Sequence, residues 1–275
     1  MADSTEVPTP AGHLRAAAQA EATQVAETEA TPEIPEIVDR QVTAEGEELL
    51  LCRAGDGEWS IRVDGKVTVA SGARRSEQSL VELAMAPLAQ RDDVTVLLAG
   101  LGMGYALRRL LDAPGVVRVD VVELYAPIVE WNRRQLAAES RGALDDPRVH
   151  VHVGDLMSTL KRFRSEPLPE VTGGWLALIL DVDDGPHAVS RPSNANIYSA
   201  EGLERLESAL RPGGVLAAWS SERDVELLQR IHARYVNVAQ LAVPVELGGK
   251  PSLDYVYRGR RAPRPPGPGS KMARA

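Results

Sequence analysis

Short apolar runs alternate with longer amphipathic stretches over residues 94–234. The runs are VTVLLAG (94–100), VVRVDVVEL (116–124), VHVHV (149–153), WLALILD (175–181) and GVLAAWS (214–220). Apolar positions at helical spacing predict helices near 104–113, 126–139, 156–163, 199–211 and 222–234. Strands buried on both faces that alternate with helices indicate an α/β fold with a Rossmann-like, doubly wound parallel sheet.

The flanking segments have other patterns. Alternating positions and the turns GDGE and VDGK predict a small β-hairpin over about 47–70, and 76–89 is typical of a helix. VNVAQLAVPVEL and LDYVYRGR predict two late strands, as an antiparallel pair. We therefore divide the chain into a disordered acidic arm (1–45), a hairpin plus helix (46–90), a main α/β domain (91–258) and a basic Pro/Gly tail (259–275).

Composition limits the function classes. The chain has 275 residues and a formal charge of −8, with its basic run confined to the tail, and aromatic residues make up 4% of it. These values do not favour nucleic-acid binding. A single cysteine, Cys52, and the lack of a secretory signal or a long apolar segment favour a cytoplasmic protein with no membrane association.

A glycine turn follows the first run. Gly100, Gly102 and Gly104 allow the backbone to pass close to a ligand at the carboxyl end of a strand. The dinucleotide fingerprint needs a small residue at position 105, where this chain has Tyr105. A tight structural turn is an alternative explanation of the glycines. A nicotinamide dehydrogenase is disfavoured, whereas a nucleoside without a pyrophosphate remains compatible.

Two acids follow the next two strands. Glu123 stands 19 residues after Gly104, where an acid can accept both ribose hydroxyl protons. Asp155 follows the third strand, where a carboxylate can accept a hydrogen bond from the exocyclic amine of adenine, although it can also cap the following helix. Together with the glycine turn, these acids predict an adenosine-binding cleft in the 91–258 domain.

The fourth strand ends in a cluster of carboxylates. Asp181, Asp183 and Asp184 repel one another unless a cation or a proton lies among them. A metal is one possibility, but the only nearby histidine is His187 on a predicted loop. A cationic or protonatable amine matches the cluster better than a metal does.

These motifs resemble those of spermidine synthases and their relatives within the class I S-adenosylmethionine-dependent methyltransferase fold. The resemblance rests on VLLAGLGMGYALRRLL, VDVVELYAPIVEWNRRQL, VHVGDLMSTL, LILDVDDGP and NIYSAEGLERLESALRPGGVLAAW. It implies Glu123 as the ribose acid, Asp155 as the base acid, and Asp181 and Asp184 as the two acids of the catalytic turn. It also implies a reduced N-terminal β-domain, and a homodimer is possible.

The chain departs from this family in two places. Met103 stands where the family has an acid that faces the free amine of decarboxylated S-adenosylmethionine. Leu80 and Val81 stand where the family has a Tyr-Gln pair that helps to hold the diamine, although Glu82 keeps an acid. These departures leave the donor open between S-adenosylmethionine and its decarboxylated form.

We assign roles to the polar residues on this basis. Asp181 is expected to act as base or to orient an amine, and Asp184 is expected to bind a second polar or cationic group of a small amine-like acceptor. Glu82 and Tyr198 are expected to bind the acceptor, although Tyr198 can also be a packing residue at a helix start. A loop that contains Arg191, Asn194 and Asn196 is expected to form a lid.

The shared chemistry is displacement at a carbon attached to a sulfonium, which needs alignment of the reactants and no covalent nucleophile. We expect methyl transfer to a small amine-like acceptor, with aminopropyl transfer as the first alternative. A nucleoside-binding homologue that has lost catalysis is the second alternative.

Overall fold

The computed structural model describes residues 34–182, 185–186, 189, 192–247 and 250–263. The chain separates into two units, Met1–Pro35 and Glu36–Ala275. Every helix and strand of the described residues lies in the second unit. Residues 1–33 and 264–275, which cover most of the predicted arm and tail, lie outside the described residues.

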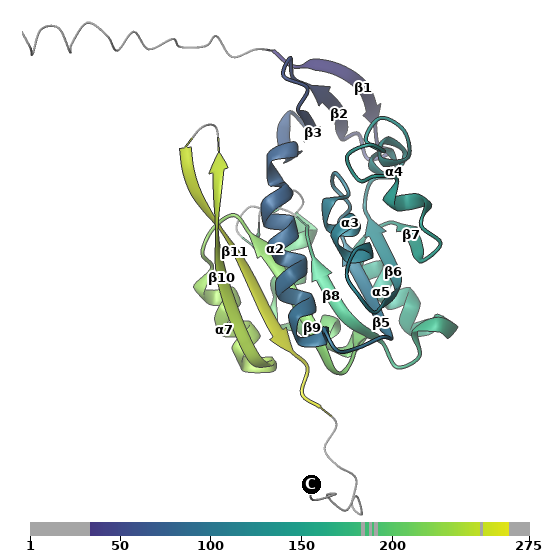
Figure 1. Ribbon diagram of the computed structural model, residues 1–275, viewed down its shortest axis with the longest axis vertical. Coiled ribbons are helices and arrows are strands. Elements are labelled where there is room, and N and C mark those ends of the chain that lie inside the picture. Colours follow the sequence, from purple (N-terminus) through teal and green to yellow (C-terminus); the bar gives the residue numbers. More distant parts are fainter. Residues whose placement is uncertain (1–33, 183–184, 187–188, 190–191, 248–249, 264–275) are drawn as a thin grey trace, which may run out of the picture. The chain divides into compact units, whose positions relative to one another are not determined.

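A seven-stranded sheet forms the centre of the second unit (Figure 1). Its strands are β5 (Val94–Ala99), β6 (Val116–Glu123), β7 (Val149–Val153), β8 (Trp175–Leu180), β9 (Leu210–Ser220), β10 (Val236–Leu247) and β11 (Lys250–Arg260). They lie in the order β10-β11-β9-β8-β5-β6-β7, and β9, β8, β5, β6 and β7 are mutually parallel. Strand β11 is antiparallel to both of its neighbours, β9 and β10. The predicted α/β fold and the late antiparallel pair are confirmed.

In the described part of the chain, six α-helices cover the two faces of this sheet. Residues of α2 (Arg74–Met85), α3 (Tyr105–Leu111) and α4 (Ala126–Arg133) join one core cluster, and residues of α5 (Leu156–Ser165), α6 (Ala200–Ala209) and α7 (Val225–Arg234) join the other. Strand β5 serves both clusters, because Val96 and Leu98 face the first and Leu97 and Ala99 face the second. Alternate side chains of a strand point to opposite faces, so a central strand with helices on both sides is predominantly apolar.

The helices match the predicted periodicity, with one difference. The stretch 126–139 was expected to be helical throughout, but α4 ends at Arg133 because Arg134 has left the helical region, at φ −124° and ψ −90°. The described connections also contain five short 3₁₀ segments: Ser71–Ala73, Ala86–Leu88, Ala143–Asp145, Pro169–Val171 and Pro192–Tyr198. Within the described part of the chain, even the longest helix, α2 with 12 residues, is too short to span a bilayer.

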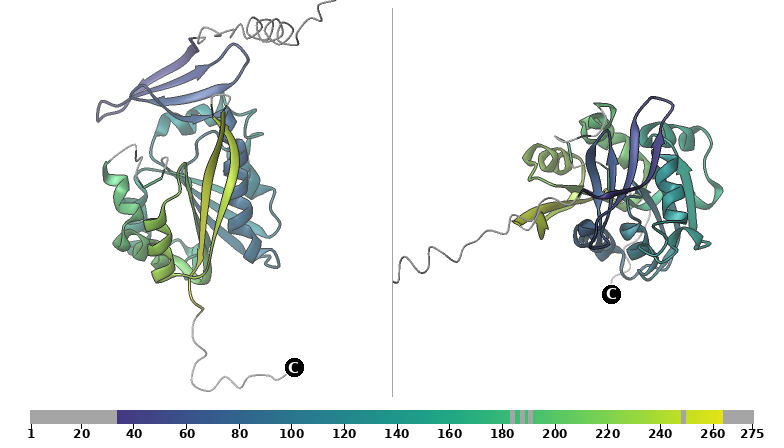
Figure 2. Two further views of the ribbon diagram at one scale, coloured as in Figure 1. Left: turned by 90° about the vertical axis from the view of Figure 1, so that its left-hand side faces the viewer. Right: turned by 90° about the horizontal axis from the view of Figure 1, so that it is seen from above.

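A second, antiparallel sheet precedes α2 (Figure 2). It contains β1 (Glu36–Val42), β2 (Glu48–Arg53), β3 (Trp59–Val63) and β4 (Lys66–Ala70) in sequential order. The arm predicted to run to residue 45 is wrong over β1. Strand β1 pairs only with β2 at the edge of the sheet and leaves six of its seven side chains exposed, so its sequence lacks an alternating apolar pattern.

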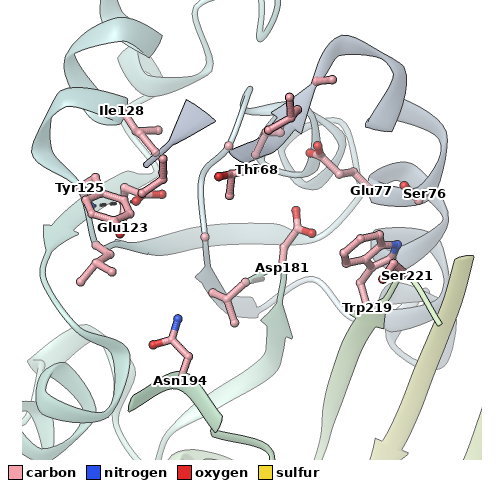
Figure 3. Close-up of a pocket in the computed structure, with 18 of the residues that line it drawn as sticks. Thr68, Ser76, Glu77, Glu123, Tyr125, Ile128, Asp181, Asn194, Trp219 and Ser221 are labelled. Carbon is pink, nitrogen blue, oxygen red and sulfur yellow. Dashed lines mark hydrogen bonds between the residues drawn. The ribbon is translucent and has the colours of Figure 1, made fainter. Parts of the chain in front are cut away.

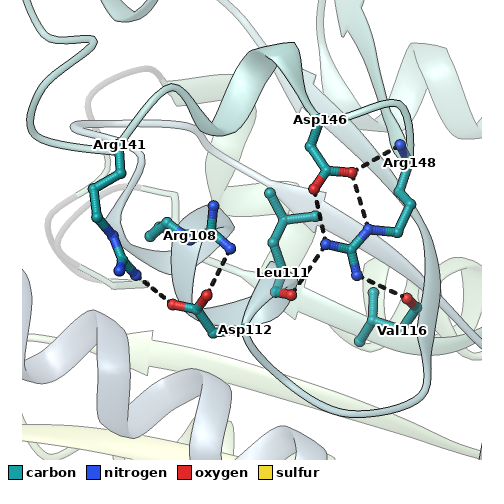
Figure 4. A network of polar contacts seen from close by, with 7 residues as sticks. All are labelled: Arg108, Leu111, Asp112, Val116, Arg141, Asp146 and Arg148. Carbon is teal, nitrogen blue, oxygen red and sulfur yellow. Dashed lines mark hydrogen bonds and ion pairs between the residues drawn. The ribbon is translucent and has the colours of Figure 1, made fainter.

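A polar network holds the turns at the amino ends of β6 and β7 (Figure 4). It contains Arg108, Leu111, Asp112, Val116, Arg141, Asp146 and Arg148. The guanidinium of Arg148 donates to the carboxylate of Asp146 and to the backbone oxygens of Leu111 and Val116, at 2.8 to 3.1 Å. Because Arg148 stands just before β7, this network joins the start of β7 to the end of α3 and the start of β6.

Candidate active site

The carboxyl ends of four parallel strands are joined by backbone hydrogen bonds. The N–H of Asp181 donates to the oxygen of Ala99 at 2.8 Å, and the N–H of Gly100 donates to Val122 at 2.9 Å. The N–H of Gly154 donates to the oxygen of Glu123 at 2.8 Å. The residues that follow β8, β5, β6 and β7 therefore lie in one row at the edge of the sheet, where ligands bind in folds of this type.

A cavity of about 640 Å³ opens above this row. Its floor is formed by the strand ends, and its other walls include parts of β4, α2, α4, the 3₁₀ segment Pro192–Tyr198 and the β10–β11 pair (Figure 3). Six acidic residues line it: Glu77, Glu123, Asp155, Asp181, Glu246 and Asp254. Among the described residues that line the cavity, none is lysine, arginine or histidine, so this space attracts cations.

The three glycines of the turn differ in position. Gly100 and Gly102 line the cavity, whereas Gly104 is not among its lining residues. All three have positive φ, and a Cβ atom on Gly100 would lie 2.0 Å from the backbone oxygen of Asp181. Glycine at position 100 therefore lets the β5 and β8 ends approach each other closely.

Glu123 and Asp155 line the same cavity from neighbouring strand ends. The carboxylate of Glu123 is 5% exposed and accepts the N–H groups of Leu101 and Tyr125, each at 2.9 Å. Burial raises the pKa of Glu123, and these two N–H groups oppose that rise. Each carboxylate oxygen still has a lone pair for a ligand hydroxyl. Asp155 also caps α5, because its Oδ1 accepts the N–H of Ser158 at 2.8 Å.

Asp181 lies at the centre of the cavity floor (Figure 3). Burial and the nearby carboxylate of Glu123 raise the pKa of Asp181 to about 7. A carboxyl group with this pKa exchanges its proton near neutral pH, which suits acid–base work. Asp183, Asp184 and His187 lie outside the described residues, so the predicted role of Asp184 and the metal alternative stay predictions.

The structure places two predicted acceptor residues away from the cavity. Glu82 projects to the surface, with 58% of its side chain exposed, and pairs with Arg109 at 3.2 Å. Tyr198 is 1% exposed, and its hydroxyl donates to the backbone oxygen of Val182 at 2.7 Å. We correct both assignments: Glu82 lies on the outer face of α2, and Tyr198 is a packing residue beneath the site.

The predicted lid is only partly described. Asn194 is 9% exposed and lines the cavity, Asn196 is exposed, and Arg191 lies outside the described residues. Met103, the residue in place of the family's acid, is fully buried in the core and does not line the cavity.

Several cavity residues were missed by sequence reasoning. On α2 they are Ser76 and Glu77, and on the late strands they include Glu246 and Asp254. Glu77 had a signal, because it lies three and four residues before Leu80 and Val81 and so belongs to the apolar face of its helix. The acids of β10 and β11 had no signal, since the tertiary fold alone brings these strands over the cavity.

A family model described as the spermine/spermidine synthase domain matches residues 78–246, more than half of the chain. The chain belongs to the spermine/spermidine synthase family. The matched range contains the glycine turn and the acids at the ends of β6, β7 and β8, so the family motifs coincide with the floor of the cavity. The predicted family resemblance is confirmed.

Individual members of the family are similar to parts of the chain. A polyamine aminopropyltransferase of Mycobacterium tuberculosis is 32% identical over 170 residues, which are 62% of this chain and 30% of that protein. Polyamine aminopropyltransferase 2 of Pseudomonas aeruginosa is 34% identical over 169 residues, 57% of this chain and 44% of that protein. The chain thus spans less than half the length of these curated relatives.

Solved structures of the family share the fold. A spermidine synthase from Thermotoga maritima matches with a TM-score of 0.64 at 16% identity, covering 82% of this chain and 73% of that one. A spermidine synthase in complex with the transition-state analogue AdoDATO matches with a TM-score of 0.63 at 15% identity, covering 82% of this chain and 72% of that one.

These matches overturn one prediction. Methyl transfer was favoured because Met103 removes the acid that faces the donor's amine in the spermine/spermidine synthase family. The family match and the relatives named polyamine aminopropyltransferase or spermidine synthase contradict methyl transfer and favour the first alternative. The prediction of methyl transfer failed because it relied on position 103 alone. One motif position does not show whether another residue supplies a carboxylate to the cavity.

Proposed function

We propose that this chain is a polyamine aminopropyltransferase that uses decarboxylated S-adenosylmethionine as donor and an unbranched aliphatic di- or polyamine as acceptor. One observation carries the proposal: six acidic residues line the cavity and none of its described lining residues is basic. The donor has a sulfonium and an ammonium group, and the acceptor has two or more amines. An acidic cavity of about 640 Å³ suits both ligands in charge and in size.

The nucleoside part of the donor fits the β6 and β7 side of the cavity. Glu123 is placed to accept the ribose hydroxyls, and Asp155 to accept the adenine amine. Apolar side chains complete this side and offer surfaces for the base: Val122, Leu124, Ile128, Leu156, Val182 and Ile197. The sulfonium then lies toward Asp181.

The reaction is a direct displacement. The lone pair of a neutral acceptor amine forms a bond to the propyl carbon attached to sulfur, and the carbon–sulfur bond breaks with its electron pair going to sulfur. The products are a secondary ammonium and the uncharged thioether 5′-methylthioadenosine. Asp181, with its pKa near 7, accepts the proton that the amine must lose.

Mass spectrometry of the products tests this proposal. The purified chain is incubated with decarboxylated S-adenosylmethionine and a series of diamines and triamines, and in parallel with S-adenosylmethionine and the same amines. We expect one amine to gain a C₃H₇N unit with equimolar methylthioadenosine, in the first series only. Methylated amines, or binding of the nucleoside without any transfer, would overturn the proposal.

A further inference from the structure

We infer that Glu77 binds the primary ammonium at the end of the donor's propyl chain and thereby selects the decarboxylated nucleoside over its carboxylated parent. This role rests on the proposed function, since it concerns the donor of that reaction. In this inference, Glu77 of α2 supplies the carboxylate that is missing at position 103 of the glycine turn.

Glu77 is fixed beside the glycine turn. Its side chain is 5% exposed and lines the cavity, and its Oε2 accepts the N–H of Ala106 in the first turn of α3 at 2.9 Å. Residue 103, by contrast, is a methionine with no exposed surface, packed in the core. The carboxylate at the glycine turn therefore comes from a neighbouring helix instead of from the turn itself.

The order of the carboxylates matches the donor. Figure 3 shows Asp181 between Glu123 and Glu77, with the carboxylates of Asp181 and Glu77 pointing into the same space. The electrostatic interactions of Asp181 with Glu123 and of Glu77 with Asp181 support this order. A nucleoside with its ribose at Glu123 and its sulfonium near Asp181 extends its propyl chain toward Glu77.

A cation between Glu77 and Asp181 would stabilise the charged form of Glu77. Burial and the neighbouring carboxyl of Asp181 raise the pKa of Glu77 well above its usual value. The nearby cation Arg74 opposes this rise, although its guanidinium also donates to Glu139 at 3.1 Å and lies over the ring of Tyr105. An ammonium group between the carboxylates of Glu77 and Asp181 removes their repulsion and keeps both charged.

The carboxylated parent is disfavoured by the same charges. S-Adenosylmethionine has a carboxylate on the carbon that bears its ammonium group, so this carboxylate would lie beside Glu77 and Asp181. Among the described residues of the cavity wall there is no lysine, arginine or histidine to pair with it. Repulsion by a like charge is an effective way to reject a close analogue.

Calorimetry with three nucleosides tests the inference. The full chain, Glu77→Gln and the control Glu82→Gln are titrated with decarboxylated S-adenosylmethionine, S-adenosylmethionine and methylthioadenosine. Glu82 is the matched control because it lies on the exposed face of the same helix. We expect the unaltered chain and Glu82→Gln to prefer the decarboxylated nucleoside, and Glu77→Gln to lose at least about tenfold of this preference with unchanged affinity for methylthioadenosine.

An unchanged preference in Glu77→Gln, with normal methylthioadenosine binding, would overturn the inference. If Glu77→Gln does not fold, Glu77→Asp decides, because its shorter side chain withdraws the carboxylate from the ammonium: a weakened preference with normal methylthioadenosine binding supports the inference, and an unchanged preference overturns it. Turnover separates the inference from the proposed function. Aminopropyl transfer with a preference independent of Glu77 overturns the inference alone, whereas a Glu77-dependent preference without transfer supports the inference and overturns the proposed reaction.

Discussion

The carboxylate of Glu123 accepts the backbone N–H of Leu101 at 2.9 Å, which ties the end of β6 to the glycine turn after β5. The same carboxylate accepts the N–H of Tyr125 at 2.9 Å, so both of its oxygens are held in place before a ligand arrives. This arrangement presents a rigid acceptor to the cavity, because β5 and β6 are adjacent strands of the parallel sheet. Pre-organised acceptors of this kind lower the entropy cost of binding.

The first prediction concerns Glu123→Gln. The amide N–H₂ group must face at least one of the two backbone N–H donors, and the charged acceptor for the ribose is lost. Hydrogen bonds to charged groups contribute about 1.5–3 kcal/mol, so we expect the affinity for methylthioadenosine to fall roughly 10- to 100-fold by calorimetry. The control is Glu130→Gln, on the exposed surface of α4. If Glu123→Gln bound methylthioadenosine as tightly as the control, Glu123 would not contribute to binding of the nucleoside.

The second prediction concerns the pH dependence of Asp181. Its pKa is raised to about 7, and the proposed reaction needs its deprotonated form. The value of kcat/KM should therefore be level above pH 7 and fall about tenfold per pH unit below it, as protonation removes the base. We expect Asp181→Asn to lose this limb and to lower kcat by roughly 10²- to 10⁴-fold.

Steady-state kinetics from pH 5.5 to 9 measures both effects. Asp92→Asn serves as the control, because Asp92 is exposed and lies at the opposite end of β5. The assignment of Asp181 fails if the same acid limb persists in Asp181→Asn.

The third prediction concerns Asp254, which lines the cavity from β11 and which we expect to bind the acceptor. The indole N–H of Trp219 donates to the carboxylate of Asp254 at 3.2 Å, and burial raises the pKa of Asp254. A half-buried carboxylate held in this way can pair with an ammonium of the acceptor. We expect Asp254→Asn to raise the KM for the acceptor about tenfold while the KM for the donor stays constant.

Initial-rate kinetics with each substrate varied in turn separates the two KM values. The exposed Glu222, changed to glutamine, is the control near the same strand ends. If Asp254→Asn changed only the KM for the donor, Asp254 would not bind the acceptor and the prediction would be wrong.

The fourth prediction concerns the stability of the glycine turn. Gly100 and Gly57 both have positive φ, at 90° and 93°, but only a Cβ on Gly100 would meet backbone, at 2.0 Å from the oxygen of Asp181. A Cβ on Gly57 would meet nothing closer than 3.9 Å. We expect Gly100→Ala to lower the free energy of unfolding by about 1–3 kcal/mol more than Gly57→Ala.

Urea denaturation of both variants measures the difference, because the strained φ is common to both and cancels. Equal losses of stability in the two variants would mean that the β5 and β8 ends can separate without cost.

The cavity floor could be predicted from the sequence because each of its residues directly follows a recognisable strand. Glu123 and Asp155 stand at or just after the ends of apolar runs, and the carboxyl ends of parallel strands meet at one edge of a sheet. Glu82 was placed wrongly because alignment to a family motif counts positions along a helix without regard to its faces. Residues five apart, such as Glu77 and Glu82, lie about 140° apart around a helix.

The sequence by itself therefore determined the alternating α/β pattern, the doubly wound sheet and the row of ligand-binding positions at its carboxyl edge, because these depend on local periodicity and on which residues end each strand. Only the tertiary structure decided which carboxylates share the cavity. Glu77, Glu246 and Asp254 come from elements far from that row in sequence and reach it through packing of α2 and the β10–β11 pair. Long-range packing leaves no local pattern, so the acidity of the cavity, and with it the cationic chemistry that we propose, became visible only in three dimensions.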